Sequence, residues 1–236
     1  MVNKTLKSVL YLTILLINFS TLAHDSSKVW EKAYKSTVVV LPTWPGYNKP
    51  GFGAPAGTAP AGTGFYMSLD DKEKMTNYIL TAAHVIKNAK IVEIKNYNNK
   101  SEQVEVILTD FKTDIAILKS KNKGQSVKVT KKKIKYGNEV CLIGNSFGIG
   151  QCLSCGIVSG LNSPRLGFNP IETFIQRDAA VNPGASGAPL LNKDGELIGM
   201  VYAIYTKEAD IDAGVNFAID IKLIQNFLNK YSSQIK

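Results

Sequence analysis

Between residues 64 and 219 the sequence is a close succession of short apolar or β-branched segments separated by turn residues. The candidate strands are 64–69, 78–81, 90–97, 103–108, 115–119, 126–129, 139–144, 151–161, 173–176, 188–191, 197–205 and 214–219. Many short strands broken by turn signals are typical of an all-β barrel or sandwich. A short amphipathic helix over 25–36 and a β-branched segment, 37–41, precede them. We therefore predict an all-β fold.

The end of the chain changes period. Ile221, Ile224 and Leu228 follow i, i+3, i+7 spacing, and Asp220 is a suitable N-cap, so one helix within residues 221–236 should close the chain. The 236 residues are 44% hydrophobic and 20% charged, a composition that suits a globular protein with a sizeable core. Either one larger all-β domain or two small ones would fit.

The N-terminus has the pattern of an export signal. Lys4 and Lys7 precede a largely apolar stretch, 9–22, and Ala23 offers a small residue for cleavage. Residues 1–23 are therefore predicted to be a signal peptide, removed on export to the periplasm or the cell exterior. The alternative is an uncleaved anchor, although the apolar run is shorter than the ~20 residues of a spanning helix. No later segment of the sequence is long and apolar enough to cross a bilayer.

The formal net charge of +9 is concentrated in the stretch 119–135, which begins at Lys119, ends at Lys135 and holds eight lysines. Such a stretch would suit contact with anionic lipid, cell-wall polymer or nucleic acid. It has no interleaved aromatic residue and no recognisable nucleic-acid motif, which favours a solvated linker and hairpin surface. We expect no specific nucleic-acid partner.

Three cysteines, Cys141, Cys152 and Cys155, would reach an oxidising compartment if the chain is exported. In an extended strand, residues three apart are about 10 Å distant, too far for a disulfide between Cys152 and Cys155. A hairpin would allow Cys141 to pair with either of the other two. Neither of the chain's two histidines is close to these thiols in sequence, so no zinc site, metal or cofactor is expected.

Residues 42–62 shift abruptly to proline, glycine and alanine, a composition that holds neither a helix nor a central strand. We predict a long exposed loop here. Loops of this length are functional or disordered, and the composition leaves both a role at the edge of a substrate site and an inert insertion open.

The segment 176–191, Q-R-D-A-A-V-N-P-G-A-S-G-A-P-L-L, contains a turn of small residues between two apolar runs. Ser186 lies between Gly184-Ala185 and Gly187, and glycine lets the backbone take steep dihedrals and lets a substrate approach the amide groups. A reactive serine would suit this position. Taken alone, a G-x-S-G match is more often an ordinary surface turn, so other residues must decide.

A nucleophilic serine needs a base within hydrogen-bond reach, most often histidine. Apart from the first residue of the predicted mature chain, the one histidine is His84, in Y-I-L-T-A-A-H-V-I. Asp114 opens the strand D-I-A-I-L-K and is the natural group to orient the imidazole. Asp110 lies further out in its turn, and Asp178 lies before the serine turn. We therefore predict His84, Asp114 and Ser186 as the catalytic set.

The order histidine, aspartate, serine is that of chymotrypsin-like proteases. The motifs T-A-A-H, D-I-A, G-N-S-F-G-I-G-Q-C-L-S-C-G-I-V-S-G-L and Q-R-D-A-A-V-N-P-G-A-S-G-A-P-L-L-N-K-D-G-E-L-I-G resemble the HtrA/Deg group of trypsin-like serine proteases. The last barrel strand of that group resembles G-V-N-F-A-I-D. The resemblance covers roughly residues 62–220. It implies two perpendicular six-stranded antiparallel β-barrels, one within residues 24–125 and one over 126–220, with the site in the cleft between them.

The resemblance also implies roles. Ser186 would attack the peptide carbonyl, His84 would transfer the proton and Asp114 would orient His84. The N–H groups of Gly184 and Ser186 would form the oxyanion hole, in which one donor is worth ~3 kcal/mol of barrier. The implied activity is that of a serine endopeptidase acting on protein or peptide substrates through an acyl-enzyme intermediate.

Three features depart from the family pattern. Ala185 stands where HtrA proteins usually have asparagine, and Ala188 where they usually have a second glycine. Digestive trypsin-like enzymes have an aspartate immediately before the serine, which pairs with a newly cut amino terminus, and uncharged Ala185 makes that activation unexpected. HtrA proteins usually continue into a peptide-binding PDZ domain, whereas this sequence stops at Lys236. Trimer assembly and regulated proteolysis are therefore not carried over, and the oligomeric state is left open.

Specificity residues follow from the same resemblance. Ala180 corresponds to the floor of the primary pocket, where an aspartate would select lysine or arginine. The edge strand that pairs with the substrate backbone would comprise Tyr202, Ala203, Ile204 and Tyr205. Small or medium aliphatic residues are therefore expected before the scissile bond. Glutamyl endopeptidases share the G-x-S-G-x-P pattern, but the second histidine with which they would read glutamate has no candidate here.

Two other classes of function are compatible with parts of the sequence. A non-catalytic peptide-binding or chaperone-like protein could keep the same fold, although the intact set of serine, histidine and aspartate disfavours it. Adhesion to an anionic surface could use the lysine-rich stretch 119–135, and such binding would weaken at high salt.

Overall fold

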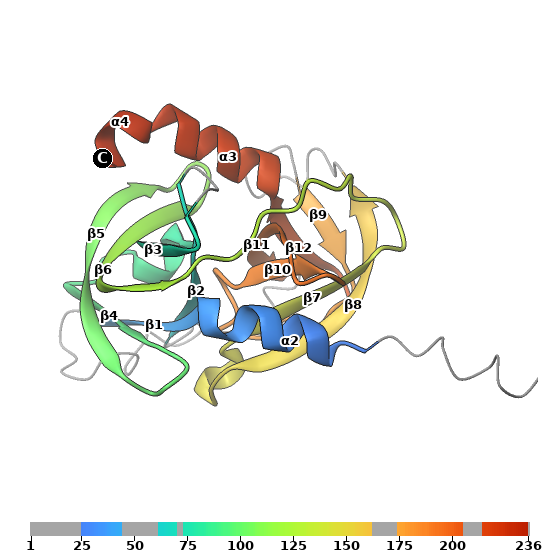
Figure 1. Ribbon diagram of the computed structural model, residues 1–236, viewed down its shortest axis with the longest axis horizontal. Coiled ribbons are helices and arrows are strands. Elements are labelled where there is room, and N and C mark those ends of the chain that lie inside the picture. The colour runs from blue at the N-terminus through green and yellow to red at the C-terminus, as the bar shows by residue number, and fades with distance from the viewer. Residues whose placement is uncertain (1–24, 44–60, 70–72, 162–173, 205–213, 236) are drawn as a thin grey trace, which may run out of the picture.

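The computed structural model describes residues 25–43, 61–69, 73–161, 174–204 and 214–235 (Figure 1). The predicted signal peptide, most of the proline- and glycine-rich segment 42–62, and Tyr205 lie outside these ranges. Within them, the chain forms two closed antiparallel barrels of six strands each, with a helix at the C-terminal end of the chain. The all-β prediction and the two six-stranded barrels are confirmed.

The first barrel has the strand order β1-β2-β3-β6-β5-β4. Its strands are β1 (Thr37–Thr43), β2 (Gly62–Tyr66), β3 (Met75–Ala82), β4 (Ile91–Lys95), β5 (Ser101–Asp110) and β6 (Ile115–Gln125). Strand β6 is longer than predicted and ends at Gln125, so the expected strand over 126–129 does not form. What remains of it is a single parallel bridge between Val129 and Leu197.

The second barrel has the order β10-β11-β12-β9-β8-β7. Its strands are β7 (Glu139–Gly144), β8 (Cys152–Leu161), β9 (Phe174–Arg177), β10 (Pro189–Asn192), β11 (Leu197–Ile204) and β12 (Asn216–Asp220). In β7 the side chains alternate between two buried environments. Val140 and Leu142 pack in the interior of this barrel, whereas Cys141 and Ile143 pack in the larger core that includes the first barrel. Because successive side chains of a strand point to opposite faces, β7 contributes side chains to both cores.

Pro42 corrects the prediction that residues 42–62 are entirely loop. Pro42 and Thr43 extend β1 and pair with β4, and Gly62 begins β2. Among the described residues, β2 pairs with β1 only over Val40 and the three residues before it. Proline is tolerated in a strand where its missing N–H removes no ladder bond.

Helical segments join the two barrels at both ends of the described chain. The helix α2 (Ser27–Ala33) continues through a 3₁₀ turn, η1 (Tyr34–Ser36), into β1, while α2 itself contacts β7 of the second barrel. The helix α3 (Ile221–Lys230) packs on β11 and β12, and α4 (Ser232–Ile235) reaches β5 of the first barrel (Figure 1). Both ends therefore fix one barrel relative to the other.

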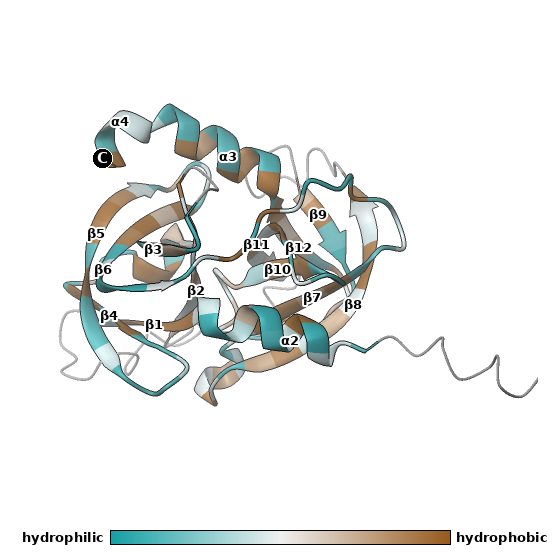
Figure 2. Ribbon diagram, in the orientation of Figure 1, coloured by the Kyte–Doolittle hydropathy of each residue, from teal (hydrophilic) through white to brown (hydrophobic). Residues whose placement is uncertain are grey.

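The C-terminal helix forms as predicted. The carboxylate of Asp220 accepts a hydrogen bond of 2.7 Å from the backbone N–H of Lys222, which makes Asp220 the N-cap. Hydrophobic and hydrophilic residues alternate along α3 (Figure 2), and its buried residues are Ile221, Ile224, Phe227 and Leu228. The apolar face packs in the same core cluster as the first barrel.

Candidate active site

His84 and Asp114 are brought together by neighbouring strands of the first barrel. Strand β3 pairs with β6 so that Ala82 lies opposite Ile115, and His84 follows in the short 3₁₀ helix η2 (Ala83–Ile86). The Nδ1 atom of His84 lies 2.7 Å from Oδ2 of Asp114, and its backbone N–H donates to Oδ1 at 2.8 Å. One carboxylate therefore holds both the ring and the backbone of the histidine.

This contact defines the chemistry of the imidazole. A carboxylate accepts hydrogen bonds, so the proton of the neutral ring is on Nδ1 and Nε2 is the free basic nitrogen. The Asp114 side chain is 6% exposed, whereas the His84 side chain is 45% exposed, so the carboxylate is buried and the ring is open to solvent. Asp114 has a φ of 55°, in the left-handed region, where Asp is among the few residue types enriched.

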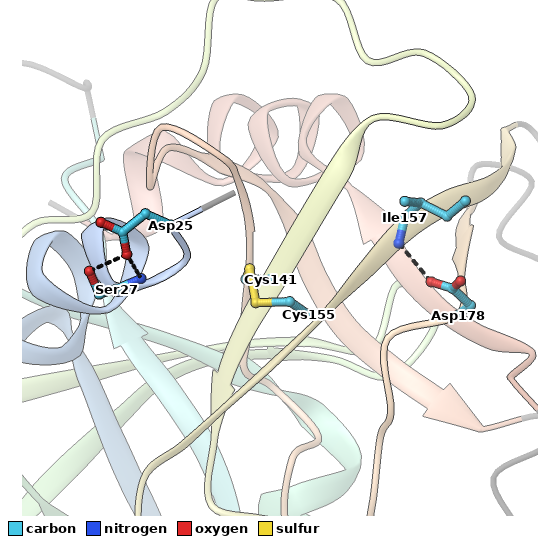
Figure 3. The surroundings of a disulfide bond; sticks show 6 residues. All are labelled: Asp25, Ser27, Cys141, Cys155, Ile157 and Asp178. Carbon is cyan, nitrogen blue, oxygen red and sulfur yellow. Dashed lines mark hydrogen bonds between the residues drawn. A yellow bond between two sulfur atoms is a disulfide. The ribbon is translucent and has the colours of Figure 1, made fainter. Parts of the chain in front are cut away.

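The other two acidic residues considered as partners of the histidine have different contacts. Asp110 accepts a hydrogen bond from the backbone N–H of Lys112 in its own turn. Asp178 accepts one of 2.6 Å from the backbone N–H of Ile157 on β8 (Figure 3). The structure thus brings together His84 and Asp114.

The serine turn lies against the end of β3, just before the histidine. Gly187, next to Ser186, is packed so closely against Thr81 and Ala82 that an added Cβ would lie 2.6 Å from Oγ1 of Thr81 and 2.8 Å from the backbone nitrogen of Ala82. Gly187 also has a φ of 83°. Glycine is therefore required here, both by conformation and by the close approach of the two barrels.

Thr63 on β2 is a residue that sequence analysis did not single out, and it connects the first barrel to the serine turn. It is 1% exposed. Its hydroxyl donates to the carbonyl oxygen of Gly184 at 2.7 Å and accepts from the backbone N–H of Asn145 at 2.9 Å. Its backbone N–H donates to the carbonyl oxygen of Ser186 at 2.9 Å. A threonine between two glycines at the start of a strand was the one available signal.

Two of the backbone amides in the turn donate to acceptors within the structure. Ala185 N–H donates to the carbonyl oxygen of Asn182 at 3.0 Å, and Gly187 N–H donates to that of Val201 at 2.9 Å. Within the described residues, the N–H groups of Gly184 and Ser186 donate to no other residue. The N–H of a serine and that of the glycine two residues before it can together stabilise a developing negative charge on an oxygen.

The backbone of Gly184 packs closely against the loop after β7. Its φ is 99°, and a Cβ added there would lie 2.2 Å from the carbonyl oxygen of Asn145. Ala185 is fully buried, with its Cβ 3.1 Å from the position of a Cβ on Gly144. The larger side chain that HtrA proteins usually have after this glycine would meet that contact, so the alanine and Gly144 fit each other.

Of the residues predicted to bind substrate, Tyr202 lies beside the histidine. The ring of Tyr202 lies edge-on to that of His84 at a centroid distance of 6.4 Å and packs on Phe174 at 5.3 Å. Ala180 is exposed. Ala203 and Ile204 continue β11 and pair with β12, after a register shift at Tyr202. Their roles, like those of the catalytic set, stay predictions.

A disulfide joins Cys141 to Cys155, which decides between the two pairings left open by the sequence (Figure 3). The two residues lie directly opposite each other in the β7–β8 pair, with a Cα–Cα distance of 4.1 Å. Cys152 lies opposite Gly144 and keeps a free thiol, whose Sγ is 3.2 Å from the carbonyl oxygen of Gly144.

Acidic residues of the β10–β11 turn neutralise part of the lysine-rich stretch. Lys128 contacts Glu196 at 2.6 Å and Lys132 contacts Asp194 at 2.6 Å. The hydrogen bond from Lys128 lowers the pKa of the Glu196 carboxyl, and that from Lys132 lowers the pKa of Asp194. Binding of this stretch to an anionic surface stays a prediction.

No group of three or more histidine, cysteine or acidic side chains in the described ranges is placed to hold a metal ion. None of the helices there is both long and apolar enough to span a membrane.

Two six-stranded antiparallel barrels, with a histidine and an aspartate on one and a serine turn on the other, define the chymotrypsin-like class of fold. Comparison with known proteins agrees. The family model "Trypsin-like peptidase domain" matches residues 62–200. This is more than half of the chain, which therefore belongs to the trypsin-like peptidase family.

Curated relatives place the similarity among DegP- and HtrA-type protease domains. The chain is 38% identical over 161 residues to "Probable periplasmic serine endoprotease DegP-like" of Buchnera aphidicola subsp. Baizongia pistaciae, over 67% of this chain and 34% of that protein. It is 37% identical over 145 residues to "Periplasmic pH-dependent serine endoprotease DegQ" of Escherichia coli strain K12, over 60% and 32%. The matches thus span about a third of the length of these relatives.

Solved structures agree with the sequence relatives. The chain superposes on "HtrA-type protease AlgW with tripeptide" with a TM-score of 0.75 and 27% identity, covering 88% of this chain and 63% of that one. The serine endoprotease from Yersinia pestis gives a TM-score of 0.70 at 26% identity, over 89% and 67%. The resemblance to HtrA-type protease domains that the motifs indicated is confirmed.

Proposed function

We propose that this chain is a periplasmic serine endopeptidase that hydrolyses peptide bonds of protein substrates. The observation that carries the proposal is the imidazole of His84, which is bound to a carboxylate on one side and exposed to solvent on the other. The neighbouring serine turn has two N–H groups that donate to no other residue of the described chain. The periplasmic location is supported by the printed names of the relatives and by the predicted signal peptide over residues 1–23.

In the proposed mechanism, Nε2 of His84 takes the proton of the Ser186 hydroxyl as the oxygen attacks the substrate carbonyl. Asp114 keeps the ring in the required tautomer and stabilises the imidazolium. The carbonyl oxygen, now negatively charged, is bound by the N–H groups of Gly184 and Ser186. His84 then gives its proton to the leaving amine. A water molecule next attacks the acyl-enzyme while His84 takes its proton, and His84 returns that proton to the Ser186 oxygen as the acid product leaves.

The proposed specificity concerns the residue before the scissile bond. Ala180 carries no charge, which disfavours selection of lysine or arginine there. Tyr202 lies between His84 and Phe174, so its ring narrows the site from the β11 side. We infer a preference for small or medium aliphatic residues, with the backbone of the substrate pairing alongside residues 202–205. Profiling of cleavage sites in a mixed peptide library would test this preference.

Labelling with a fluorophosphonate probe tests the nucleophile. The wild-type chain should be labelled, and Ser186→Ala and His84→Ala should not. Ser233→Ala, an exposed serine in α4, is the matched control and should be labelled like the wild type. A folded wild-type protein that takes up no label would contradict the proposal, as would equal labelling of Ser186→Ala.

A further inference from the structure

The strand order places the serine turn between the ends of two strands. Strand β10 follows the turn directly and is flanked by β11 on one edge and β7 on the other. Both pairs are antiparallel, with Leu190 opposite Leu142 of β7 and Gly199 of β11. Both neighbours are antiparallel to β10, so the C-terminal end of each lies beside the residues that precede β10. Ser186 is therefore flanked by the end of β11 and by the loop after β7.

In a peptidase, the two sides of the serine bind different parts of the substrate, the residues before and the residues after the scissile bond. The end of β11 carries Tyr202 beside His84 and is the proposed edge for residues before the scissile bond. An extended substrate that enters along β11 and presents its carbonyl to Ser186 must continue across Gly184 towards the loop after β7. Residues after the scissile bond should therefore meet this loop.

The loop after β7 presents two exposed apolar side chains. Phe147, in the 3₁₀ turn η3 (Ser146–Gly148), is 63% exposed, and Ile149 is 80% exposed, the highest value among the exposed large hydrophobic residues of the described chain. Large apolar side chains in contact with water are informative when they cluster at a site. The pair lies at the serine turn, since Phe147 N–H donates to the carbonyl oxygen of Pro183 at 2.6 Å.

The loop is held in place by its own hydrogen bonds. Asn145, which is 2% exposed, accepts from Gly148 N–H at its carbonyl oxygen (3.0 Å) and from Gly150 N–H at its side-chain oxygen (2.9 Å). Phe147 has a φ of 54°, which is uncommon for a residue with a side chain. Such a conformation persists where the surroundings fix it and is frequent at functional sites. The backbone that carries the two exposed side chains is thus held at the serine turn.

We propose that Phe147 and Ile149 form the contact surface for the leaving-group side of the substrate, and that they select polypeptides with an apolar side chain one or two residues after the scissile bond. This proposal rests on the proposed peptidase function and adds to it a preference on the leaving-group side. Together with an aliphatic preference on the β11 side, it defines the preferred cleavage site as apolar on both sides of the cleaved bond.

The test uses two peptides with the same acyl part, one with leucine and one with serine at both positions after the scissile bond. An aryl ester of that acyl part, which has no residue after the bond, serves as a third substrate. The wild-type full-length protein should prefer the leucine peptide by roughly tenfold in kcat/KM, the lower end of what one apolar contact supplies. Ile149→Ser and Phe147→Asn should each bring the ratio close to one. Asparagine is chosen because it tolerates the left-handed region.

Tyr136→Ser is the matched control, since Tyr136 is 66% exposed and precedes β7 at the end away from the serine turn. It should keep the wild-type ratio. A wild-type ratio near one, with the ester turned over, would overturn this proposal and leave the peptidase function intact. An unchanged ratio in both loop variants would also overturn it. Failure of the wild type to turn over even the ester would refute the peptidase function and this proposal with it.

Discussion

Replacement of Thr63 by valine tests how the first barrel controls the serine turn. Valine has nearly the shape of threonine but no hydroxyl, so the backbone pairing of β2 is kept. Two hydrogen bonds are lost, one to the carbonyl oxygen of Gly184 and one from the N–H of Asn145. Both of these groups are buried, so each is left without its partner.

The expected magnitude follows from these two groups. A buried polar group that loses its partner costs about 1–3 kcal/mol, so the loss of two such partners in Thr63→Val should destabilise the fold by about 2–6 kcal/mol in total. Typical domains have about 5–15 kcal/mol of stability, so the variant should still fold. Gly184 also carries a proposed oxyanion donor worth ~3 kcal/mol. If the turn shifts, kcat should fall by roughly 10–100-fold with little change in KM, because the lost contact acts in the transition state.

The assay combines urea unfolding with steady-state hydrolysis of an aryl ester. Thr63→Ser keeps the hydroxyl and should retain kcat within about threefold of the wild type. A Thr63→Val protein with wild-type kcat and wild-type unfolding free energy would refute the role assigned to this residue. Lower stability with unchanged kcat would show that the contact holds the barrels together without positioning the oxyanion donors.

Three further predictions address other parts of the structure. Asp114→Asn, which tolerates the observed φ, should lower kcat roughly 10⁴-fold by favouring the wrong tautomer, as steady-state kinetics would show, and full activity would contradict the assigned role. Replacing both Cys141 and Cys155 by alanine removes the disulfide that links residues 14 positions apart. The free energy of unfolding in urea should fall by about 3 kcal/mol, and an unchanged midpoint would contradict this. Since Lys128 lowers the pKa of Glu196, stability should be lost as the pH falls through that lowered value, and Glu196→Gln should flatten the profile of unfolding free energy below the ordinary carboxyl pKa of 4.5; parallel profiles would refute it.

The class of fold could be predicted because strand periodicity and turn residues are local signals. The C-terminal helix could be predicted for the same reason, since Asp220 and the buried face of α3 lie within a few residues of one another. The strand expected over 126–129 was wrong because the same β-branched pattern also suits an extended segment that follows a longer β6. Pro42 was misplaced because the sequence does not show how far the pairing of β1 with β4 extends.

The positions that depend on distant contacts could not be predicted from the sequence. Thr63 resembles any β-branched strand residue, and its partner Gly184 is 121 positions away. The pairing of Cys141 with Cys155 depends on the register of β7 and β8, which the spacing of three cysteines does not determine. His84 and Asp114 could be proposed from the sequence because His84 is the one well-placed histidine and Asp114 opens an apolar strand. The hydrogen bonds between them required the structure.

The division of the site between two barrels has a consequence for the newly made chain. His84 and Asp114 are synthesised before Ser186, and a first barrel alone would hold a base with no nucleophile to activate. Contacts as distant as that of Thr63 with Gly184 form only after the entropy of closing a long loop has been overcome. A peptidase built in this way is chemically inert while it is unfolded or half folded. Under the proposed function, the compartment in which the chain is synthesised would be protected from the nucleophile, and activity would begin with the docking of the second barrel.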